Sequence, residues 1–151
     1  MLVRTLLKAV PVALLALALM PVAAPVTGQE PTLYQRLGGY DALAAVVDDF
    51  LARLAGDPQL ERFFAGHSTD SLQRIRQRIV EQLCAATGGP CVYTGRDMKT
   101  AHQGLGITEA DWEAGVTHLK ATLETFKVPE TERRDVLTAI SAMKADIVEA
   151  R

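Results

Sequence analysis

Aromatic residues and histidines are scarce in this sequence, and positive charge has no surplus. Phe, Trp and Tyr make up 5% of the 151 residues, and three histidines are present. Sixteen Lys and Arg residues stand against 18 Asp and Glu residues, for a formal charge of −2. Nucleic-acid-binding proteins need a basic face to neutralise phosphates, so this balance argues against that class. The densest basic cluster, "RIRQR" at residues 74–78, fits the exposed edge of a helix.

A long uninterrupted hydrophobic run is also missing. Residues 9–24 are rich in Ala, Leu and Val, but Pro11 and Pro21 interrupt them, which makes this stretch a poor membrane-spanning helix. Two basic residues precede it and small residues follow it, the layout of a secretory signal. We therefore predict a signal peptide at residues 1–28, cleaved or kept as an anchor, and one domain over residues 29–151. Removing the signal would change the formal charge from −2 to −4.

The sequence has two cysteines, Cys84 and Cys91, with six residues between them. Export would bring them into an oxidising compartment, where a disulfide can form and persist. Gly88, Gly89 and Pro90 between them allow the chain to turn back on itself. Two unpaired buried thiols also fit this spacing, so the pairing stays open. The spacing is not a redox-enzyme signature.

Apolar residues recur at spacings of three and four, which predicts an all-α domain. No segment has the alternation of a strand, and neither an internal repeat nor a linker is evident. Glycines and prolines separate the predicted helices. These helices cover residues 33–37, 41–56, 68–86, a short segment around His102 begun by Asp97, residues 109–126 and residues 129–147.

One histidine lies in an unusual setting, the glycine-bounded segment "YTGRDMKTAHQGLGIT" at residues 93–108. Met98, His102 and Leu105 would share one apolar face of a short helix. A histidine that points inward from such a face is either a hydrogen-bonded core residue or a ligand. Its immediate neighbours alone favour the core residue.

Four segments together resemble one family. "LYQRLGGYDAL", "DPQLERFFAG", "GGPCVYTGRDM" and "AHQGLGIT", in this order, are similar to group I truncated haemoglobins, from about Tyr34 to about Ile147. The glycine pairs at residues 38–39 and 88–89 fall at the joints where that family shortens the globin fold. The resemblance implies a two-over-two helical sandwich around haem b, which binds O2, NO or CO. Together with the signal-like segment, it predicts an exported, periplasmic protein.

The resemblance also implies roles for individual residues around the haem. His102 would be the proximal iron ligand, and its second ring nitrogen would donate to an acceptor that fixes its orientation. Met98 and Leu105 would lie against the porphyrin beside it. Phe64 would wedge the porphyrin, with Phe63 packed behind it.

The two haem propionates would be bound by basic and hydroxyl side chains. Arg78 falls where the family often carries a basic residue that reaches a propionate. Tyr93 and Arg96 are further candidates, whereas Lys99 fits a solvated face better. Arginine forms forked hydrogen bonds with carboxylates, although exposed pairs contribute only about 0–1 kcal/mol.

The ligand side of the haem departs from the family pattern. Leu51 stands where many relatives have a tyrosine, and Ile75 and Ile79 fall where glutamines are common. With Phe64, these residues predict an apolar ligand pocket. A hydrogen bond to O2 is worth about 1–3 kcal/mol, so its absence weakens O2 binding about ten- to hundredfold. NO and CO carry less charge and would lose less.

The sequence leaves several functions open. Reversible gas binding fits best, while NO dioxygenation would need an external reductase, because no flavin or nicotinamide motif is present. An electron-transfer protein is a second reading, with the loop histidine His67 as a sixth iron ligand. A haem-free helical interaction module, stapled by a Cys84–Cys91 bridge, is a third. Whether the protein is an enzyme is therefore not decided at this level.

Overall fold

The structure, a computed structural model, describes residues 29–149, so the predicted signal peptide lies outside the described residues. This part is all-helical, which confirms the predicted fold class. None of its helices combines the length and hydrophobicity needed to cross a bilayer. The elements are α1 (Leu33–Arg36), α2 (Gly39–Gly56), the 3-10 turn η1 (Glu61–Phe63), α3 (Thr69–Ala86), α4 (Met98–His102), α5 (Glu109–Thr125), α6 (Glu130–Ser141) and α7 (Lys144–Ile147).

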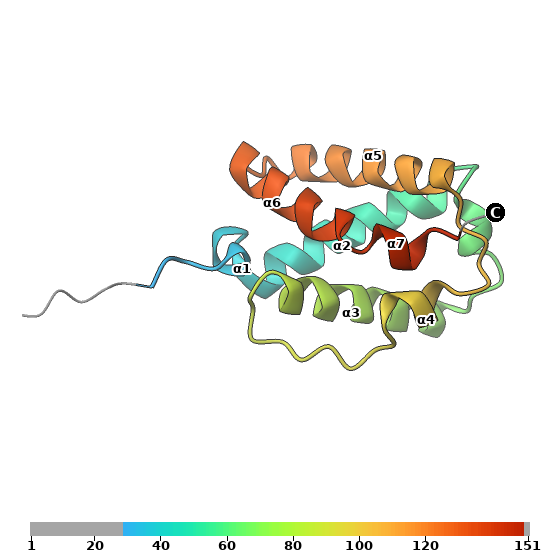
Figure 1. The fold of residues 1–151 in the computed structure, drawn as a ribbon, viewed down its shortest axis with the longest axis horizontal. Helices are drawn as coiled ribbons and strands as arrows, with labels where there is room; N and C mark the ends of the chain where they lie inside the picture. The colour runs from blue at the N-terminus through green and yellow to red at the C-terminus, as the bar shows by residue number, and fades with distance from the viewer. Residues whose placement is uncertain (1–28, 150–151) are drawn as a thin grey trace, which may run out of the picture.

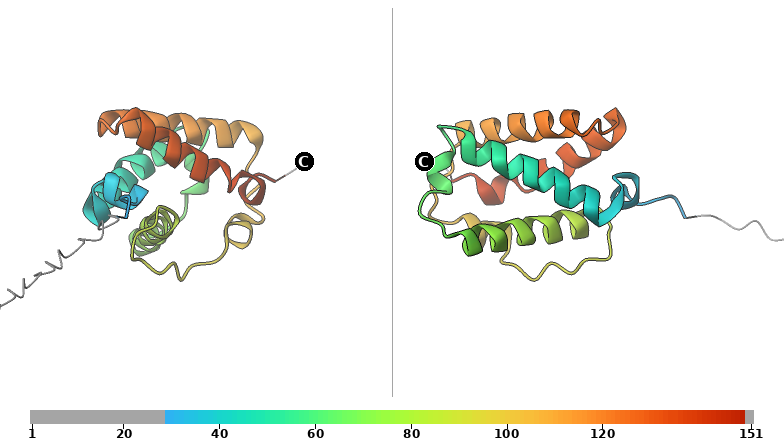
Figure 2. Two further views of the ribbon diagram at one scale, coloured as in Figure 1. Left: turned by 60° about the vertical axis from the view of Figure 1, so that its left-hand side comes forward. Right: turned by 180° about the vertical axis from the view of Figure 1, so that it is seen from behind.

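Helix α2 is the centre of the fold. It packs against α3 on one side and α5 on the other, and α6 in turn packs on α5 and α1 (Figure 1). The pair α2–α3 therefore lies over the pair α5–α6, the predicted two-over-two sandwich. Helix α4 contacts α7, and both lie toward the right-hand side of the left view of Figure 2.

The hydrophobic core lies mainly between α2, α5 and α6. Val46, Leu119, Leu123 and Val136 form its buried cluster. Partly buried side chains surround this cluster: Leu33, Leu37, Phe50, Val128, Leu137 and Ile140. These residues recur three or four apart on each helix, so the sequence periodicity identified the correct faces.

Helix α3 packs through a different face from the one that its periodicity predicted. Val80 and Cys84 are completely buried, whereas Leu72 of the predicted stripe is 38% exposed. Ile75 and Ile79 are only half-buried. Successive residues are about 100° apart around a helix, so Val80 and Cys84 form a second apolar face beside the predicted one. One face of α3 thus packs in the core, and Ile75 and Ile79 lie on the adjoining face.

A partly buried polar contact joins α2 to α5. The Asp49 carboxylate accepts hydrogen bonds from Arg53 Nε at 2.6 Å and from the hydroxyl of buried Thr122 at 2.7 Å. Arg53 also donates to the Thr125 hydroxyl at 3.0 Å. The hydrogen bonds from Arg53 and Thr122 lower the pKa of Asp49. The carboxylate therefore stays ionised and links the two helices.

The predicted last helix, residues 129–147, is wrong in its length. The chain leaves α6 at Ala142 and resumes as α7 at Lys144, although neither glycine nor proline stands at the break. The Met143 amide donates to the Ile140 carbonyl, three residues back, which tightens the turn there. Because α7 contacts α4, tertiary packing rather than a local breaker accounts for the interruption.

The joint after α3 is closed by a disulfide. Cys84 and Cys91 are bonded, with their Cα atoms 5.7 Å apart, which settles the open pairing. Gly88 has a φ of 80°, a left-handed conformation that favours glycine. The Tyr34 amide donates to the Thr87 carbonyl at 2.8 Å, so the start of α1 is held against this joint.

Buried Asp111 fastens the start of α5 to the segment that leads into η1. Its carboxylate accepts hydrogen bonds from Gln59 Nε2 at 3.0 Å, from Arg62 Nη2 at 2.7 Å and from the Thr108 amide and hydroxyl at 2.9 and 2.7 Å. Thr108 and Asp111 also form a capping box at the start of α5. Burial alone would raise the pKa of Asp111, but the combined hydrogen bonds outweigh it and hold that pKa well below its usual range.

At position 89 the backbone lies so close to Tyr34 and Cys84 that only glycine fits. A Cβ there would lie 2.6 Å from the Tyr34 ring, 2.7 Å from Cys84 Sγ and 2.8 Å from the Cys84 carbonyl oxygen.

We expect Gly89→Ala to lower the free energy of unfolding by about 1–3 kcal/mol, the usual cost of overpacking. Gly115→Ala is the matched control, because its Cβ meets nothing within 4 Å in the middle of α5. That control should gain about 0.5–1 kcal/mol in urea unfolding. Equal effects of the two substitutions would contradict this view of the joint.

The Asp111 network predicts a pH-dependent loss of stability. At pH 7 we expect Asp111→Asn to lower the free energy of unfolding by about 1–3 kcal/mol, since charge-assisted hydrogen bonds are lost. The native pKa lies below that of the unfolded chain, about 3.9. The contribution is therefore full above about pH 5 and disappears as the pH falls toward the native pKa.

Urea unfolding at pH 7 and pH 3 measures this difference between wild type and Asp111→Asn. Asp146→Asn, at an exposed position of α7, is the control and should change little at either pH. A difference between wild type and Asp111→Asn that stays constant down to pH 3 would contradict the ionised network.

Candidate functional site

The helix that carries His102 is only five residues long. Asp97 caps its start: the carboxylate accepts hydrogen bonds from the Thr100 amide and hydroxyl, both at 2.8 Å, and these bonds lower the pKa of Asp97. The helix ends at His102, and Leu105 lies beyond it with 47% of its surface exposed. Met98 and His102 thus share α4 as predicted, whereas the prediction that Leu105 continues the same helical face is wrong. The glycine-containing turn after His102 ends the helix first.

The His102 imidazole is held in one orientation by its own helix. Its Nδ1–H donates to the Met98 carbonyl oxygen at 2.7 Å, and the side chain is half-buried. This bond assigns the proton to Nδ1 and leaves the Nε2 lone pair available. A second ring nitrogen bound to a carbonyl is the usual support of a histidine that ligates a metal. The donor chemistry of His102 therefore fits an iron ligand.

The chain between α3 and α4 is held by side chains and by the disulfide. Residues 90–96 make no backbone–backbone hydrogen bond in the described structure. The disulfide anchors Cys91, and the Tyr93 hydroxyl donates to the Arg96 carbonyl at 2.6 Å. Burial raises the pKa of Tyr93, so its phenol remains a donor at neutral pH. This segment sets the position from which α4 begins.

Two of the predicted propionate-binding residues lie on this segment, and the third faces it from α3. Arg78 donates to Glu81 Oε2 at 2.7 Å and to the Thr94 hydroxyl, which brings it to the stretch that contains Tyr93 and Arg96. Arg78 is 48% exposed, and Arg96 is exposed as well. The three residues therefore lie on or beside the segment between α3 and α4, with Arg78 bound to protein partners.

A small pocket of about 190 Å³ lies between α2, Phe64 and the first half of α3. It brings together three residues predicted from the sequence: Leu51, Phe64 and Ile75. Ile79, one turn further along α3, is not part of this lining. Ala52, Ala55 and Leu72 complete the wall. The alanines were missed by the sequence analysis, and their place near Leu51 on one face of α2 was the signal available.

The two neighbouring phenylalanines point to different surroundings. Phe64 lines the apolar pocket, whereas the Phe63 ring lies 4.3 Å from the Arg62 guanidinium carbon. Arg62 also binds Asp111, so Phe63 is connected to the network that holds η1 against α5. Phe63 is not among the residues that line the pocket, and its ring packs against Arg62.

The other two histidines lie elsewhere. His67 is exposed in the loop before α3 and does not line the pocket. His118 on α5 bonds through Nε2 to Asp57 Oδ2 at 2.6 Å, and this hydrogen bond lowers the pKa of Asp57. His118 therefore joins α5 to the end of α2, a structural contact.

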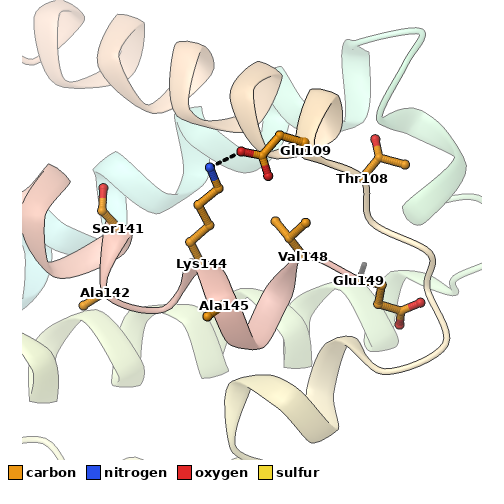
Figure 3. Close-up of a pocket in the computed structure, with 8 residues that line it drawn as sticks. All are labelled: Thr108, Glu109, Ser141, Ala142, Lys144, Ala145, Val148 and Glu149. Atoms are coloured by element: carbon orange, nitrogen blue, oxygen red, sulfur yellow. Dashed lines mark hydrogen bonds and ion pairs between the residues drawn. The ribbon is translucent and has the colours of Figure 1, made fainter. Parts of the chain in front are cut away.

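A larger pocket of about 640 Å³ lies between α5 and α7 (Figure 3). None of the site residues predicted from the sequence lines it. Lys144 from α7 and Glu109 from α5 form an ion pair across it. Its remaining lining residues are Thr108, Ser141, Ala142, Ala145, Val148 and Glu149. The sequence pattern gave no signal for it, because it depends on the break between α6 and α7.

The chemistry of these side chains fits a mostly apolar group that carries a metal and two carboxylates. One imidazole has a free nitrogen, and half-buried Met98, Ile75 and Ile79 offer apolar surface. Arg78, Tyr93 and Arg96 supply basic and hydroxyl groups on or beside the segment before α4. This is the donor set that iron protoporphyrin requires.

Comparison with known proteins agrees with this fit. The model of the bacterial-like globin family matches residues 32–149. The chain is 38% identical over 116 residues to the group 1 truncated haemoglobin of Mycolicibacterium paratuberculosis, which covers 77% of this chain and 83% of that protein.

Solved structures give the same result. The Fe(III) form of Tetrahymena pyriformis truncated haemoglobin superposes with a TM-score of 0.73 at 27% identity, over 80% of this chain and 100% of that one. The 2/2 haemoglobin of Synechococcus, in the cyanomet state with covalently attached haem, gives 0.72 at 26% identity, over 78% and 98%. The cofactor of this fold is haem, whose iron binds small gases. The chain belongs to the bacterial-like globin family and, within it, to the group 1 truncated haemoglobins.

Proposed function

We propose that this protein binds O2, NO and CO reversibly at a five-coordinate haem b held by His102. The observation that carries the proposal is the hydrogen bond from His102 Nδ1–H to the Met98 carbonyl, which leaves Nε2 free to ligate iron. Haem, when bound, would supply an iron centre that takes up a diatomic gas, and His102 would hold that iron. His67 is exposed and outside the pocket lining, which supports an open sixth position.

The apolar pocket sets which gas is favoured. Leu51, Phe64 and Ile75 present only carbon atoms, and the other lining residues are apolar too. O2 accepts a hydrogen bond more strongly than CO does, so a pocket without a donor discriminates little in favour of O2. We infer a general gas-binding role with rapid release of O2. NO dioxygenation would require an external reductase.

The propionates would be bound at the edge formed by Arg78, Tyr93 and Arg96. Arg78 now pairs with Glu81 and Thr94 at the surface. Exposed ion pairs contribute only about 0–1 kcal/mol, so a change of partner from Glu81 to a propionate costs little. Tyr93 and Arg96 lie on the segment that the disulfide anchors, so their positions are supported from the α3 side.

We also propose that the protein is exported, with the periplasm as its compartment. The signal-like composition of residues 1–28 supports this location. The Cys84–Cys91 disulfide supports it independently, because such bonds persist in oxidising compartments and are rare in the cytosol.

The test of the iron ligand is the His102→Ala variant. Wild-type protein should take up one haemin and show a five-coordinate high-spin ferrous spectrum that converts fully on addition of CO. His102→Ala should lose stable haem, because no other imidazole replaces the missing ligand, and added imidazole should restore it. Absorption spectra of the ferric, ferrous and CO forms measure this.

His67→Ala is the control and should keep the wild-type spectra. A low-spin six-coordinate ferrous wild type that becomes five-coordinate in His67→Ala would overturn the open sixth position. A protein that takes up no haemin would leave the helical interaction module as the alternative.

The Leu51→Tyr variant tests the apolar pocket. Its hydroxyl would add the missing donor, worth about 1–3 kcal/mol, and should slow O2 dissociation about ten- to hundredfold. CO dissociation should change much less. Leu51→Phe is the matched control, since it has the same ring without the hydroxyl. Stopped-flow dissociation rates decide the point: equal O2 rates in the two variants would show that Leu51 does not face the bound gas.

A further inference from the structure

The turn that follows His102 is not part of a helix. Gly104 and Gly106 have φ values of 84° and 65°, and the Leu105 amide donates to the His102 carbonyl at 3.1 Å. The chain thus leaves α4 through a tight turn directly after the imidazole-bearing residue. A helix of five residues is far below the length of about 12–15 residues at which isolated helices become marginally stable. The position of His102 therefore depends on what holds this turn.

One residue, Glu149, binds both ends of the turn. Its carboxylate accepts a hydrogen bond from the Gly104 amide, and its own amide donates to the Ile107 carbonyl at 2.9 Å. Figure 3 shows the Glu149 side chain beside the chain that runs from α4 to Thr108. Hydrogen bonds to an ionised carboxylate are about twice as strong as those between neutral groups. Glu149 is thus a clamp across residues 104–107.

The clamp is brought there by the break between α6 and α7. Helix α7 contacts α4 directly, and Glu149 follows it by two residues. The α7 side chain Lys144 is paired with Glu109 on α5, so the ion pair fixes α7 from its other side. The larger of the two pockets, between α5 and α7, is a consequence of the same arrangement. Without the break, the end of the chain would not lie at this turn.

We propose that Glu149 is a positioning residue for His102. By holding the Gly104 amide two residues after the imidazole, it keeps the end of α4 wound and the Nδ1–Met98 bond intact. The orientation of Nε2, and with it the strength of the iron–histidine bond, then depends on Glu149. This inference rests on the proposed role of His102 as iron ligand.

The experiment compares haem-loaded wild type with Glu149→Ala, which removes the acceptor, and Glu149→Gln, which keeps an amide oxygen in its place. Glu113→Ala, at an exposed position of α5, is the control for loss of one surface carboxylate. Three measurements are made: hydrogen exchange of the Gly104 amide by NMR, transfer of haem to excess apomyoglobin, and the ferrous iron–histidine stretching band by resonance Raman.

For Glu149→Ala we expect faster exchange at Gly104, haem loss about tenfold faster, and a shifted iron–histidine band. Glu149→Gln should restore most of the three values, and Glu113→Ala should match wild type. Haem loss that accelerates without a band shift would mean a merely structural role and would overturn the proposal, as would wild-type values throughout.

His102→Ala separates this failure from a failure of the proposed function. An iron–histidine band that persists in His102→Ala would mean that another residue ligates iron, which contradicts the proposed function and with it the positioning role. A band lost in His102→Ala but unchanged in Glu149→Ala contradicts the positioning role alone.

Discussion

The site depends on the orientation of one imidazole that is carried by a helix too short to be stable alone. The bond from His102 Nδ1–H to the Met98 carbonyl closes within α4, so it exists only while this five-residue helix is wound. Isolated helices of this length do not persist in water, and tertiary contacts must supply the missing stability. Asp97 and the disulfide-anchored segment hold its start, and α7 with Glu149 holds its end.

The apolar side of the site depends on a second constraint, the division of α3 into two faces. Val80 and Cys84 bind the helix to the core, so Ile75 and Ile79 on the adjoining face are left half-buried. A single helix can thus serve both the core and a cofactor, because residues four apart share a face and successive residues do not. The Asp111 network holds the segment before Phe64, which lines the pocket together with Ile75.

Much of the site could be predicted from sequence because its parts are local. His102, Met98 and the capping residue Asp97 lie within six residues, and the periodicity of the long helices indicates which side chains face inward. Leu51, Phe64 and Ile75 came from a resemblance in register, and the structure places all three around one pocket. Leu105 and the length of the last helix were predicted wrongly because helical spacing continues in the sequence where the chain actually turns.

The sequence by itself determined most of the helices, the cap at Asp97 and the glycine joints, since each depends on neighbours within a turn or two, whereas the ligand role of His102 came from the family resemblance. Only the tertiary structure decided that α6 ends at Ser141, that α7 packs on α4 and that Glu149 reaches Gly104. No local breaker marks Ala142, so the free energy that bends the chain there comes from contacts about 45 residues apart in sequence, between α7 and α4. A pattern with a period of 3.6 residues carries no information about such contacts.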